Sequence, residues 1–440
     1  MFNPNKNIII DSNHDLFIFD LSIDGKIAYN HFDSNLNLLD TNNLSEDLTL
    51  NYSVTIDGND IIHLVALINS GELHYYKYTD KQWHKNTIAK FNLKSNIYNQ
   101  FETLIINDKL HLIYNYSNLI NSNIWTIQHI VYDSRREEQY NAIRYISKKT
   151  PEQFVVDSDS LGNIHLLYIN YINNFPQVYH SFYNPYGKVW NPHPKLLSSD
   201  NVNNLFPYLF IDSNNNIHCL WVEDLKYKLN LRVMKMNASG KEKFTWKEIN
   251  LPHIFLSSGY PFIFELNNKL QLIFISKDKI HSLESEDYGN SWIKTTGDID
   301  FKDSLKIYKS RLSPLNYPDK VNLVFFDEGD KGEIYFINHF FSANSFSFIE
   351  SPEEVEEAQE ELTNDYTEYK VSSEPVESVP SYILEFSEKL DNLISNQCSL
   401  EESLEKIINN QSKIINKLEN LENLLMENTR SFWARIFNKN

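Results

Sequence analysis

Cysteine is almost absent from this chain, which has 2 of them in 440 residues. Cys219 and Cys398 lie far apart, in regions of different pattern, so they offer neither a disulfide framework nor zinc-ligand spacing. The sequence therefore favours a reducing compartment, and it predicts no metal and no other cofactor.

Long apolar runs are missing as well. No stretch approaches the roughly 18 apolar residues that suggest a membrane span. The opening, MFNPNKNIII, lacks the apolar core and the small-residue cleavage site of a signal peptide. These absences predict a cytoplasmic protein.

Basic residues are outnumbered, with 40 Lys and Arg against 59 Asp and Glu, which gives a net charge of −19. Much of the excess lies in residues 350–380, and the sequence has no basic stripe. A protein that binds nucleic acid needs such a stripe to neutralise phosphates. We therefore predict that nucleic acid is not a partner.

Glycine is scarce at 11 residues, and no glycine-rich phosphate loop is present. The G-x-S-x-G and H-E-x-x-H motifs are also missing. Carboxylates are plentiful, but a linear sequence does not place two of them at the separation that a glycosidase needs. The motifs that carry common enzyme chemistry are thus not found.

One pattern returns from residue 8 to 349: a short apolar strand, a turn rich in Asp, Asn or Gly, and a second strand. A third strand follows, and often a fourth that carries tryptophan. The second strands begin at residues 16, 62, 110, 164, 217, 270 and 321. Four strands in about 50 residues, repeated, are typical of a β-propeller blade. The sequence therefore predicts a mainly β chain with a seven-bladed β-propeller over residues 1–349, and residues 2–7 are a candidate strand for closing the ring.

The segment SEDYGNSW alternates defined residues and closes on tryptophan. These residues are Ser285, Asp287, Gly289, Ser291 and Trp292. The segment resembles the Asp box, S-x-D-x-G-x-[ST]-W, of sialidases and other bacterial neuraminidase-repeat propellers. The resemblance implies a structural turn between the third and fourth strands of a blade, on the rim away from the active centre.

A sialidase also needs three arginines that converge on the substrate carboxylate, a tyrosine nucleophile with a glutamate partner, and an aspartate acid/base. The propeller region has five arginines, and none stands in the Arg-Ile-Pro context that opens the sialidase pattern. They are Arg135, Arg136, Arg144, Arg232 and Arg311. We therefore predict a non-catalytic member of the family, and the alternative is a carbohydrate-binding lectin or a sialidase-like glycoside hydrolase.

Histidine occupies the same position in four successive second strands, and an amide takes that position in the last two repeats. These residues are His63, His111, His165, His218, Gln271 and Asn322. Four imidazoles in a ring would suit a metal. An amide keeps the hydrogen bond but not the metal affinity, so the pattern favours a buried hydrogen bond between blades.

The loops between second and third strands break the repeat in length and content, and departures from symmetry are where repeat proteins tend to place function. These loops predict a ligand-binding face for a protein or a glycan. Its candidate residues are Tyr116, Tyr171, Trp221, Glu223, Asp224, Asp327 and Glu328.

Residues 350–380 hold eleven acids and one lysine, too much like charge to fold alone, which predicts a disordered acidic linker. Apolar heptads follow over residues 381–429 and predict an α-helical coiled coil. Apolar e positions favour a trimer or tetramer over a dimer. The a positions that define the homo-oligomer include Leu390, Gln397, Leu404, Gln411, Leu418 and Leu425.

The tail, residues 430–440, interleaves aromatic and basic side chains. Its candidate contact residues are Phe432, Trp433, Arg435, Ile436 and Phe437. Such a segment suits an anionic membrane surface at the inner face or a protein partner. Together these features predict a scaffold or adaptor: a propeller interaction head that is oligomerised by a coiled coil and tethered at a membrane surface.

Overall fold

The computed structural model describes residues 2–133, 136–226, 228–277, 279–295, 299–300, 304–328 and 333–335. Within these ranges the chain is built from β-strands, with one short 3-10 turn at Pro314–Asn316 and no α-helix. The described part contains no helix long and apolar enough to cross a membrane. The predicted linker, coiled coil and tail all lie outside the described residues.

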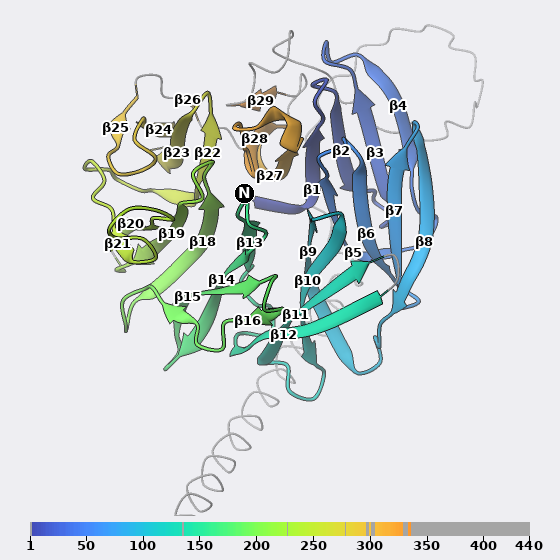
Figure 1. The fold of residues 1–440 in the computed structure, drawn as a ribbon, viewed down its shortest axis with the longest axis horizontal. Helices are drawn as coiled ribbons and strands as arrows, with labels where there is room; N and C mark the ends of the chain where they lie inside the picture. The colour runs from blue at the N-terminus through green and yellow to red at the C-terminus, as the bar shows by residue number, and fades with distance from the viewer. Residues whose placement is uncertain are drawn as a thin grey trace, which may run out of the picture. The chain divides into compact units, whose positions relative to one another are not determined.

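The strands form six sheets arranged around a central axis, which makes the fold a six-bladed β-propeller (Figure 1). Five sheets are each built from consecutive strands, and we name each by the residues that it spans. The 49–90 sheet holds β5 (Thr49–Ile56), β6 (Ile62–Ile68), β7 (Glu72–Thr79) and β8 (Gln82–Lys90); the 96–146 sheet holds β9 (Asn96–Ile106), β10 (Lys109–Asn118), β11 (Ile124–Asp133) and β12 (Arg136–Ile146).

The other three sheets of this kind have shorter outer strands. The 155–196 sheet holds β13 (Val155–Ser158), β14 (Ile164–Ile172), β15 (Phe175–Asn184), β16 (Val189–Trp190) and β17 (Lys195–Leu196); the 203–248 sheet holds β18 (Asn203–Ile211), β19 (Ile217–Asp224), β20 (Leu229–Met236) and β21 (Trp246–Glu248); the 258–300 sheet holds β22 (Ser258–Leu266), β23 (Lys269–Ser276), β24 (Lys279–Ser285), β25 (Ile293–Lys294) and β26 (Ile299–Asp300).

The sixth sheet joins both ends of the ring, and it shows that the prediction of seven blades was wrong. The first and seventh repeats share this one seven-stranded sheet, in the order β29-β28-β27-β1-β2-β3-β4. We call it the shared sheet. Its strands are β1 (Phe2–Ile10), β2 (Leu16–Leu21), β3 (Ile27–Phe32), β4 (Leu38–Asn43), β27 (Leu305–Leu312), β28 (Leu323–Asp327) and β29 (Glu333–Tyr335).

Two repeats merge because β1 forms ladders along both of its edges. It pairs antiparallel with β2, where Ile9 lies opposite Phe17, and parallel with β27, where Ile9 lies opposite Arg311. The innermost strands of the first and last repeats are therefore hydrogen-bonded neighbours in one sheet. Closure runs through residues 2–10, a longer segment than the predicted residues 2–7.

Aspartate shapes the turn between the first and second strands of four repeats. In the 203–248 sheet, Asp212 Oδ1 accepts hydrogen bonds from the backbone N–H groups of Asn214 and Asn216, at 3.0 and 2.8 Å. Asn215, between them, has a φ of 62°, a left-handed conformation that Asn tolerates. Asp11, Asp57 and Asp159 make the equivalent pairs of bonds. These turns set the register of each inner hairpin.

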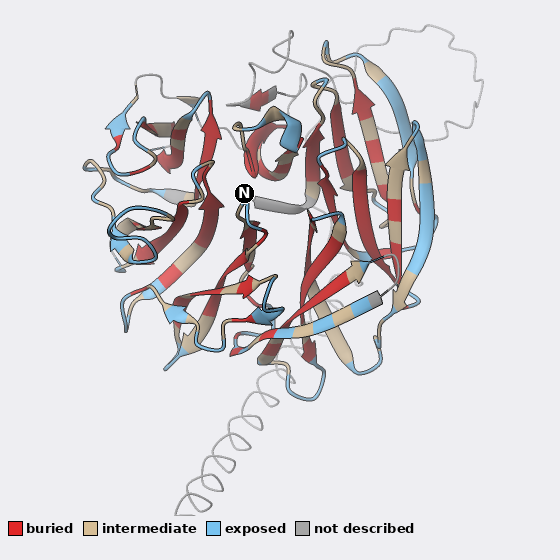
Figure 2. Cartoon of the chain, viewed as in Figure 1, coloured by how far each residue is buried: buried red, intermediate tan, exposed pale blue. Residues whose placement is uncertain are grey.

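The core lies between neighbouring sheets, and burial decreases from the axis outward (Figure 2). All residues of β6 are buried, whereas β8 is mostly exposed. Inner strands are covered on both faces by neighbouring sheets, so they contain continuous apolar runs instead of a strict alternation. Between the shared sheet and the 49–90 sheet, for example, Phe19 packs in one cluster with Leu64 and Tyr76.

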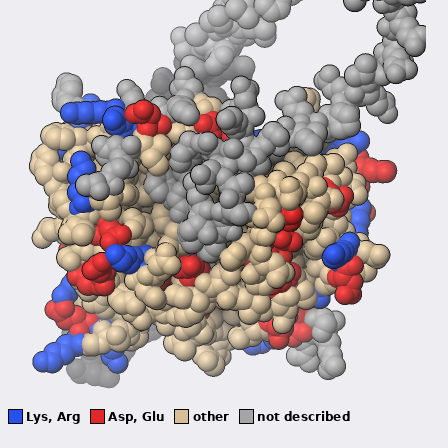
Figure 3. Space-filling view, turned by 90° about the horizontal axis from the view of Figure 1, so that it is seen from above, with Lys and Arg blue, Asp and Glu red and all other residues tan. Residues whose placement is uncertain are grey.

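Charged side chains are dispersed on the side of the ring that Figure 3 shows. Lys and Arg lie close to Asp and Glu in small groups among uncharged residues. Ion pairs among the described residues include Lys269 with Glu284 at 2.8 Å and Lys188 with Glu138 at 2.6 Å. On this side, the described residues form no basic stripe.

Candidate functional site

The seven predicted ligand-face residues have different surroundings. Tyr116 and Asp224 line open hollows at the ends of β10 and β19. Tyr171 lies beneath Lys148, whose Nζ is 5.4 Å from the centroid of the ring. Trp221 is 2% exposed and packs in the core between the 155–196 and 203–248 sheets.

The three remaining residues are carboxylates: Glu223 and Asp327 are buried, and Glu328 is exposed. Glu223 is buried, and its carboxylate accepts a hydrogen bond from Arg232 Nε at 2.7 Å. Asp327 is buried at the end of β28. Glu328 accepts hydrogen bonds from Lys6 Nζ and from the Tyr308 hydroxyl. The structure therefore does not bring the seven residues together in one site.

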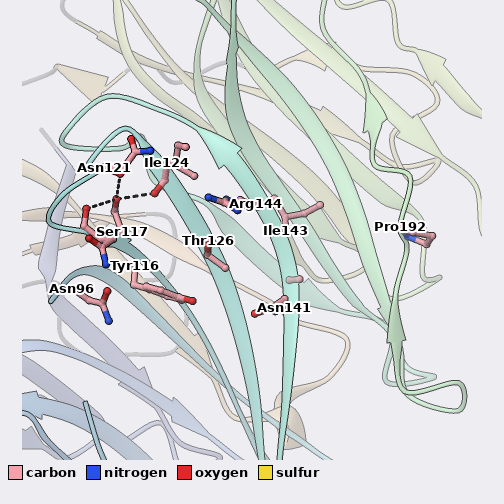
Figure 4. Close-up of a pocket in the computed structure, with 12 residues that line it drawn as sticks. Asn96, Tyr116, Ser117, Asn121, Ile124, Thr126, Asn141, Ile143, Arg144 and Pro192 are labelled. Carbon is pink, nitrogen blue, oxygen red and sulfur yellow. Dashed lines mark hydrogen bonds between the residues drawn. The ribbon is translucent and has the colours of Figure 1, made fainter. Parts of the chain in front are cut away.

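Tyr116 belongs to an open pocket of about 510 Å³ on the 96–146 sheet (Figure 4). We call it the Asn-rich pocket, because four of its side chains are asparagines. Its lining residues are Asn96, Tyr116, Ser117, Asn118, Asn121, Ile124, Thr126, Asn141, Ala142, Ile143, Arg144 and Pro192.

Hydrogen bonds within the loop between β10 and β11 hold one side of the pocket. Ser117 Oγ lies 2.7 Å from Ile124 O and 3.0 Å from Asn121 O, contacts that Figure 4 draws as dashed lines. Asn121 N donates to Asn118 O at 3.0 Å, and Ile120 N donates to Asn118 Oδ1 at 2.9 Å. Because its own bonds fix the loop, this side of the pocket is formed before any ligand arrives.

Strand register places three pocket side chains in one row. Tyr116 of β10 lies opposite Thr126 of β11, and Thr126 lies opposite Arg144 of β12. Residues directly opposite each other in a pleated sheet point to the same face. A phenol, a hydroxyl and a guanidinium thus share one surface. Among the described residues, Arg144 is exposed and forms no ion pair with a carboxylate.

Aromatic rings form a wall beside this row. The ring centroids of Tyr98 and Tyr116 are 5.9 Å apart, and those of Phe91 and Tyr98 are 4.8 Å apart. Tyr114 joins the cluster, and burial raises the pKa of its hydroxyl. Tyr98 and Tyr114 both pack against the ring of Tyr116.

The lining can form hydrogen bonds but offers no pair of groups for proton transfer. Its polar side chains are amides, hydroxyls and one guanidinium, and its lining residues include no Asp, Glu, His or Cys. Asn121 and Asn141 are exposed, and no other described side chain bonds to their amides. The pocket therefore presents donors and acceptors that a ligand can use.

Sequence reasoning found part of this pocket. The loop around Tyr116 departs from the repeat in length, and it does line the pocket. Thr126, Asn141 and Arg144 were missed as pocket residues because they lie on β11 and β12, whose register is not visible in a repeat pattern. Arg144 stands out in the sequence as one of few arginines, but it does not match the sialidase motif, and nothing else in the sequence links it to Tyr116.

The SEDYGNSW segment forms the turn between β24 and β25, and Asp287 holds it together. Asp287 Oδ1 accepts from Ser291 N at 2.8 Å and from the Ser285 hydroxyl at 2.8 Å, and Gly289 N donates to Ser285 Oγ at 2.8 Å. Burial acts to raise the pKa of Asp287, but these hydrogen bonds lower it below its usual value. Trp292 is buried in the core, and the turn is a structural element.

The four aligned histidines are buried and hydrogen-bonded, but their partners lie within the same sheet and not between blades as predicted. His63 contacts Asp57 Oδ2 at 3.0 Å and Tyr75 OH at 2.6 Å. His218 contacts Asp212 Oδ2 at 2.8 Å. The described residues contain no group of three or more potential ligands suited to a metal ion.

The other two aligned histidines pair with a second histidine on the third strand. The ring nitrogens of His111 and His129 are 3.0 Å apart, and those of His165 and His180 are 3.1 Å apart. Burial lowers the pKa of His111 to about 4, and it lowers the pKa of His129 well below its usual value. Both imidazole pairs are buried in the core.

No protein-family model matches the chain, and no curated protein matches it. Among solved structures it is similar to the BP39L lectin from Burkholderia pseudomallei, at 10% identity and a TM-score of 0.48, over 76% of this chain and 96% of that one. It is also similar to an α-L-arabinanase from Penicillium chrysogenum, at 9% identity and a TM-score of 0.41, over 63% of this chain and 93% of that one. Likenesses this remote do not establish a ligand, and the propeller assignment rests on the chain's own strand order.

Proposed function

We propose that this protein is a non-catalytic carbohydrate-binding propeller whose ligand occupies the Asn-rich pocket. The observation that carries the proposal is the lining itself. Exposed amides, a phenol and a hydroxyl surround Arg144, which forms no ion pair among the described residues. We expect the preferred glycan to carry an acidic group that reaches Arg144.

Side-chain amides suit sugar hydroxyls because each amide both donates and accepts hydrogen bonds. Asn121 and Asn141 offer two such groups, and Tyr116 adds an aromatic ring with a polar tip. The guanidinium of Arg144 can make two parallel hydrogen bonds to one carboxylate. The pocket volume of about 510 Å³ lies within the range of roughly 300–1,000 Å³ that is usual for small-molecule sites.

The same lining supports binding over hydrolysis. Glycoside hydrolysis ordinarily needs two carboxyl groups that flank the scissile bond, about 5–5.5 or 6.5–9.5 Å apart. The residues that line the pocket include no carboxylate and no histidine. We therefore expect a glycan to leave the protein chemically unchanged.

A protein ligand is the second candidate, and the exposed loop tip beside the pocket favours it. The side chain of Ile120 is 97% exposed and that of Leu119 is 50% exposed. An apolar tip next to a polar pocket suits contact with a folded partner. A scaffold role, homo-oligomerisation, contact with an anionic membrane and a cytoplasmic location all stay predictions, because their evidence lies in the sequence alone.

A glycan array probed with the full-length protein tests the proposal, followed by calorimetry on the strongest ligands. Arg144→Gln should weaken binding of acidic glycans at least tenfold, and Asn141→Ala should weaken all bound glycans. Lys85→Gln is the matched control, because Lys85 is an exposed cation of another sheet, and it should bind as the wild type does.

Two results would count against a glycan-binding pocket: no glycan bound above background, or equal binding by wild type, Arg144→Gln and Asn141→Ala.

A separate assay addresses catalysis. Aryl sialosides and the bound glycans should stay intact during prolonged incubation, and steady release of product would contradict the non-catalytic role.

A further inference from the structure

A second cavity lies on the propeller axis, where the innermost strands converge. Its lining includes Glu102 of β9, Val156 of β13, Tyr208 of β18, Tyr260 of β22 and Arg311 of β27. A smaller adjoining cavity shares Glu102 and Arg311 and adds residues of β1 and β5. We call the two together the axial cavity. All six sheets contribute to it. It shares no lining residue with the Asn-rich pocket.

The charges that line the axial cavity do not balance. The lining holds two cations, Lys309 and Arg311, and one carboxylate, Glu102. Glu102 is buried, and it accepts hydrogen bonds from Lys309 Nζ and from Gln100 Nε2. The carboxylate is therefore matched by Lys309, and one positive charge is left on Arg311.

Another carboxylate on the inner strands is also matched. Asp157 is buried and accepts from Lys320 Nζ at 2.8 and 2.7 Å through its two oxygens. The hydrogen bond described for the Arg311 guanidinium goes to the backbone oxygen of Ser310, at a long 3.5 Å. Among the described residues, Arg311 has no carboxylate partner.

A buried hydroxyl in the adjoining cavity is also unsatisfied. Ser310 is 1% exposed, and no described atom forms a hydrogen bond with its Oγ. Buried polar groups in folded proteins almost always have a partner, either protein or a bound molecule. The Arg311 guanidinium, which has no carboxylate partner among the described residues, and the unbonded Ser310 hydroxyl thus belong to residues that both line the adjoining cavity.

We propose that the axial cavity binds one small monoanion, with a carboxylate group as its best-fitting form, on Arg311. A guanidinium presents a planar fork of donors that matches the two oxygens of a carboxylate. The apolar walls supplied by Val156 and Leu323 strengthen that attraction relative to water.

The size of the cavity limits the ligand. The main chamber has a volume of about 50 Å³. A single water needs roughly 10–15 Å³ of such space, so the chamber accepts a group about as large as an acetate ion. Larger anions would have to stay outside, with only a carboxylate end inserted.

Thermal unfolding of the full-length protein in sodium acetate tests this site, with ionic strength held constant by a bulky morpholine sulfonate that the chamber excludes. Acetate should raise the unfolding midpoint with a saturating dependence on concentration, because a ligand that binds only the folded state stabilises it. The Arg311→Gln variant should require at least ten times more acetate for the same rise, and Lys85→Gln, which changes an exposed cation of another sheet, should respond as the wild type does.

Without acetate, Arg311→Met should unfold at the same temperature as the wild type or higher, because it removes a charge without a partner. A lower midpoint for Arg311→Met would mean that Arg311 has a structural partner and would overturn the proposal. An equal response to acetate and to the bulky sulfonate, or an unchanged response in Arg311→Gln, would overturn it as well. Should Arg311→Gln fail to fold, a weaker acetate response in Ser310→Ala supports the site and an unchanged one contradicts it.

Discussion

At the scale of single residues, the aligned buried histidines of this propeller form hydrogen bonds with residues of the same sheet. His63 and His218 each contact the aspartate six residues earlier, which also shapes the preceding turn. His111 instead meets His129 on the next strand. One sequence position therefore has two kinds of partner, and each forms at least one hydrogen bond with a buried imidazole.

The pH dependence of stability should depend on His111. Burial lowers its pKa to about 4 in the folded protein, against about 6.5 in an unfolded chain. Between these values the unfolded state binds the proton and the folded state does not, so stability is full above about pH 6.5 and is lost as the pH falls. The shift corresponds to about 3 kcal/mol. His111→Gln should make the free energy of unfolding less steep across this window, as measured by urea denaturation at each pH.

His193 provides the control for this experiment, because its side chain is exposed. His193→Gln should keep the wild-type pH profile. A profile that is equally steep in His111→Gln and in the wild type would show that His111 does not bear the acid sensitivity.

At the scale of elements, the repeat pattern predicted strands and their order well but not the closure of the ring. In the sequence, each repeat's hairpin is marked by an apolar run and a polar turn, such as the turn at Asp212. Which strand edges meet between distant repeats is decided by three-dimensional packing. The parallel pairing of β1 with β27 therefore could not be read from a local period.

The residues of the candidate sites also differ in whether the sequence alone could identify them. The loop that follows Tyr116 was identifiable because it breaks the repeat. Arg144 joins it only through the register of β11 and β12, and Arg311 reaches the axis only because β27 is an innermost strand. Trp221, which looked like a loop-face residue, is instead 2% exposed because the second strand of its sheet is buried on both faces.

A glycine substitution tests the packing of the turn between β24 and β25. Gly289 has a φ of 80°, and an added Cβ would lie 2.6 Å from His218 Cε1 of the neighbouring sheet. Gly289→Ala should destabilise the protein by about 3 kcal/mol, from backbone strain plus overpacking. Gly240 has a φ of 86° with open space around it, so Gly240→Ala should cost about 1 kcal/mol. Chemical denaturation gives both values, and equal losses would show that the contact with His218 is not restrictive.

At the scale of the whole molecule, β1 joins the two ends of the ring. Ile8, Ile9 and Ile10 are each 0% exposed. Ile9→Ala should lower the free energy of unfolding by about 3 kcal/mol, because it leaves a cavity in the core. Ile23 is fully exposed, so the same substitution there should change stability by less than about 0.5 kcal/mol. Denaturation curves for both variants check this, and a small loss for Ile9→Ala would show that the ring does not depend on β1.

The pairing of β1 with β27 also affects how the protein is made. During synthesis β1 can pair with β2 almost at once, but its other edge has no partner until β27, which begins at Leu305, has left the ribosome. At about 5–20 residues per second, translation of the intervening roughly 300 residues takes on the order of 15–60 s. Throughout that interval the nascent chain carries an open strand edge beside three consecutive isoleucines, a natural target for a chaperone that binds emerging chains.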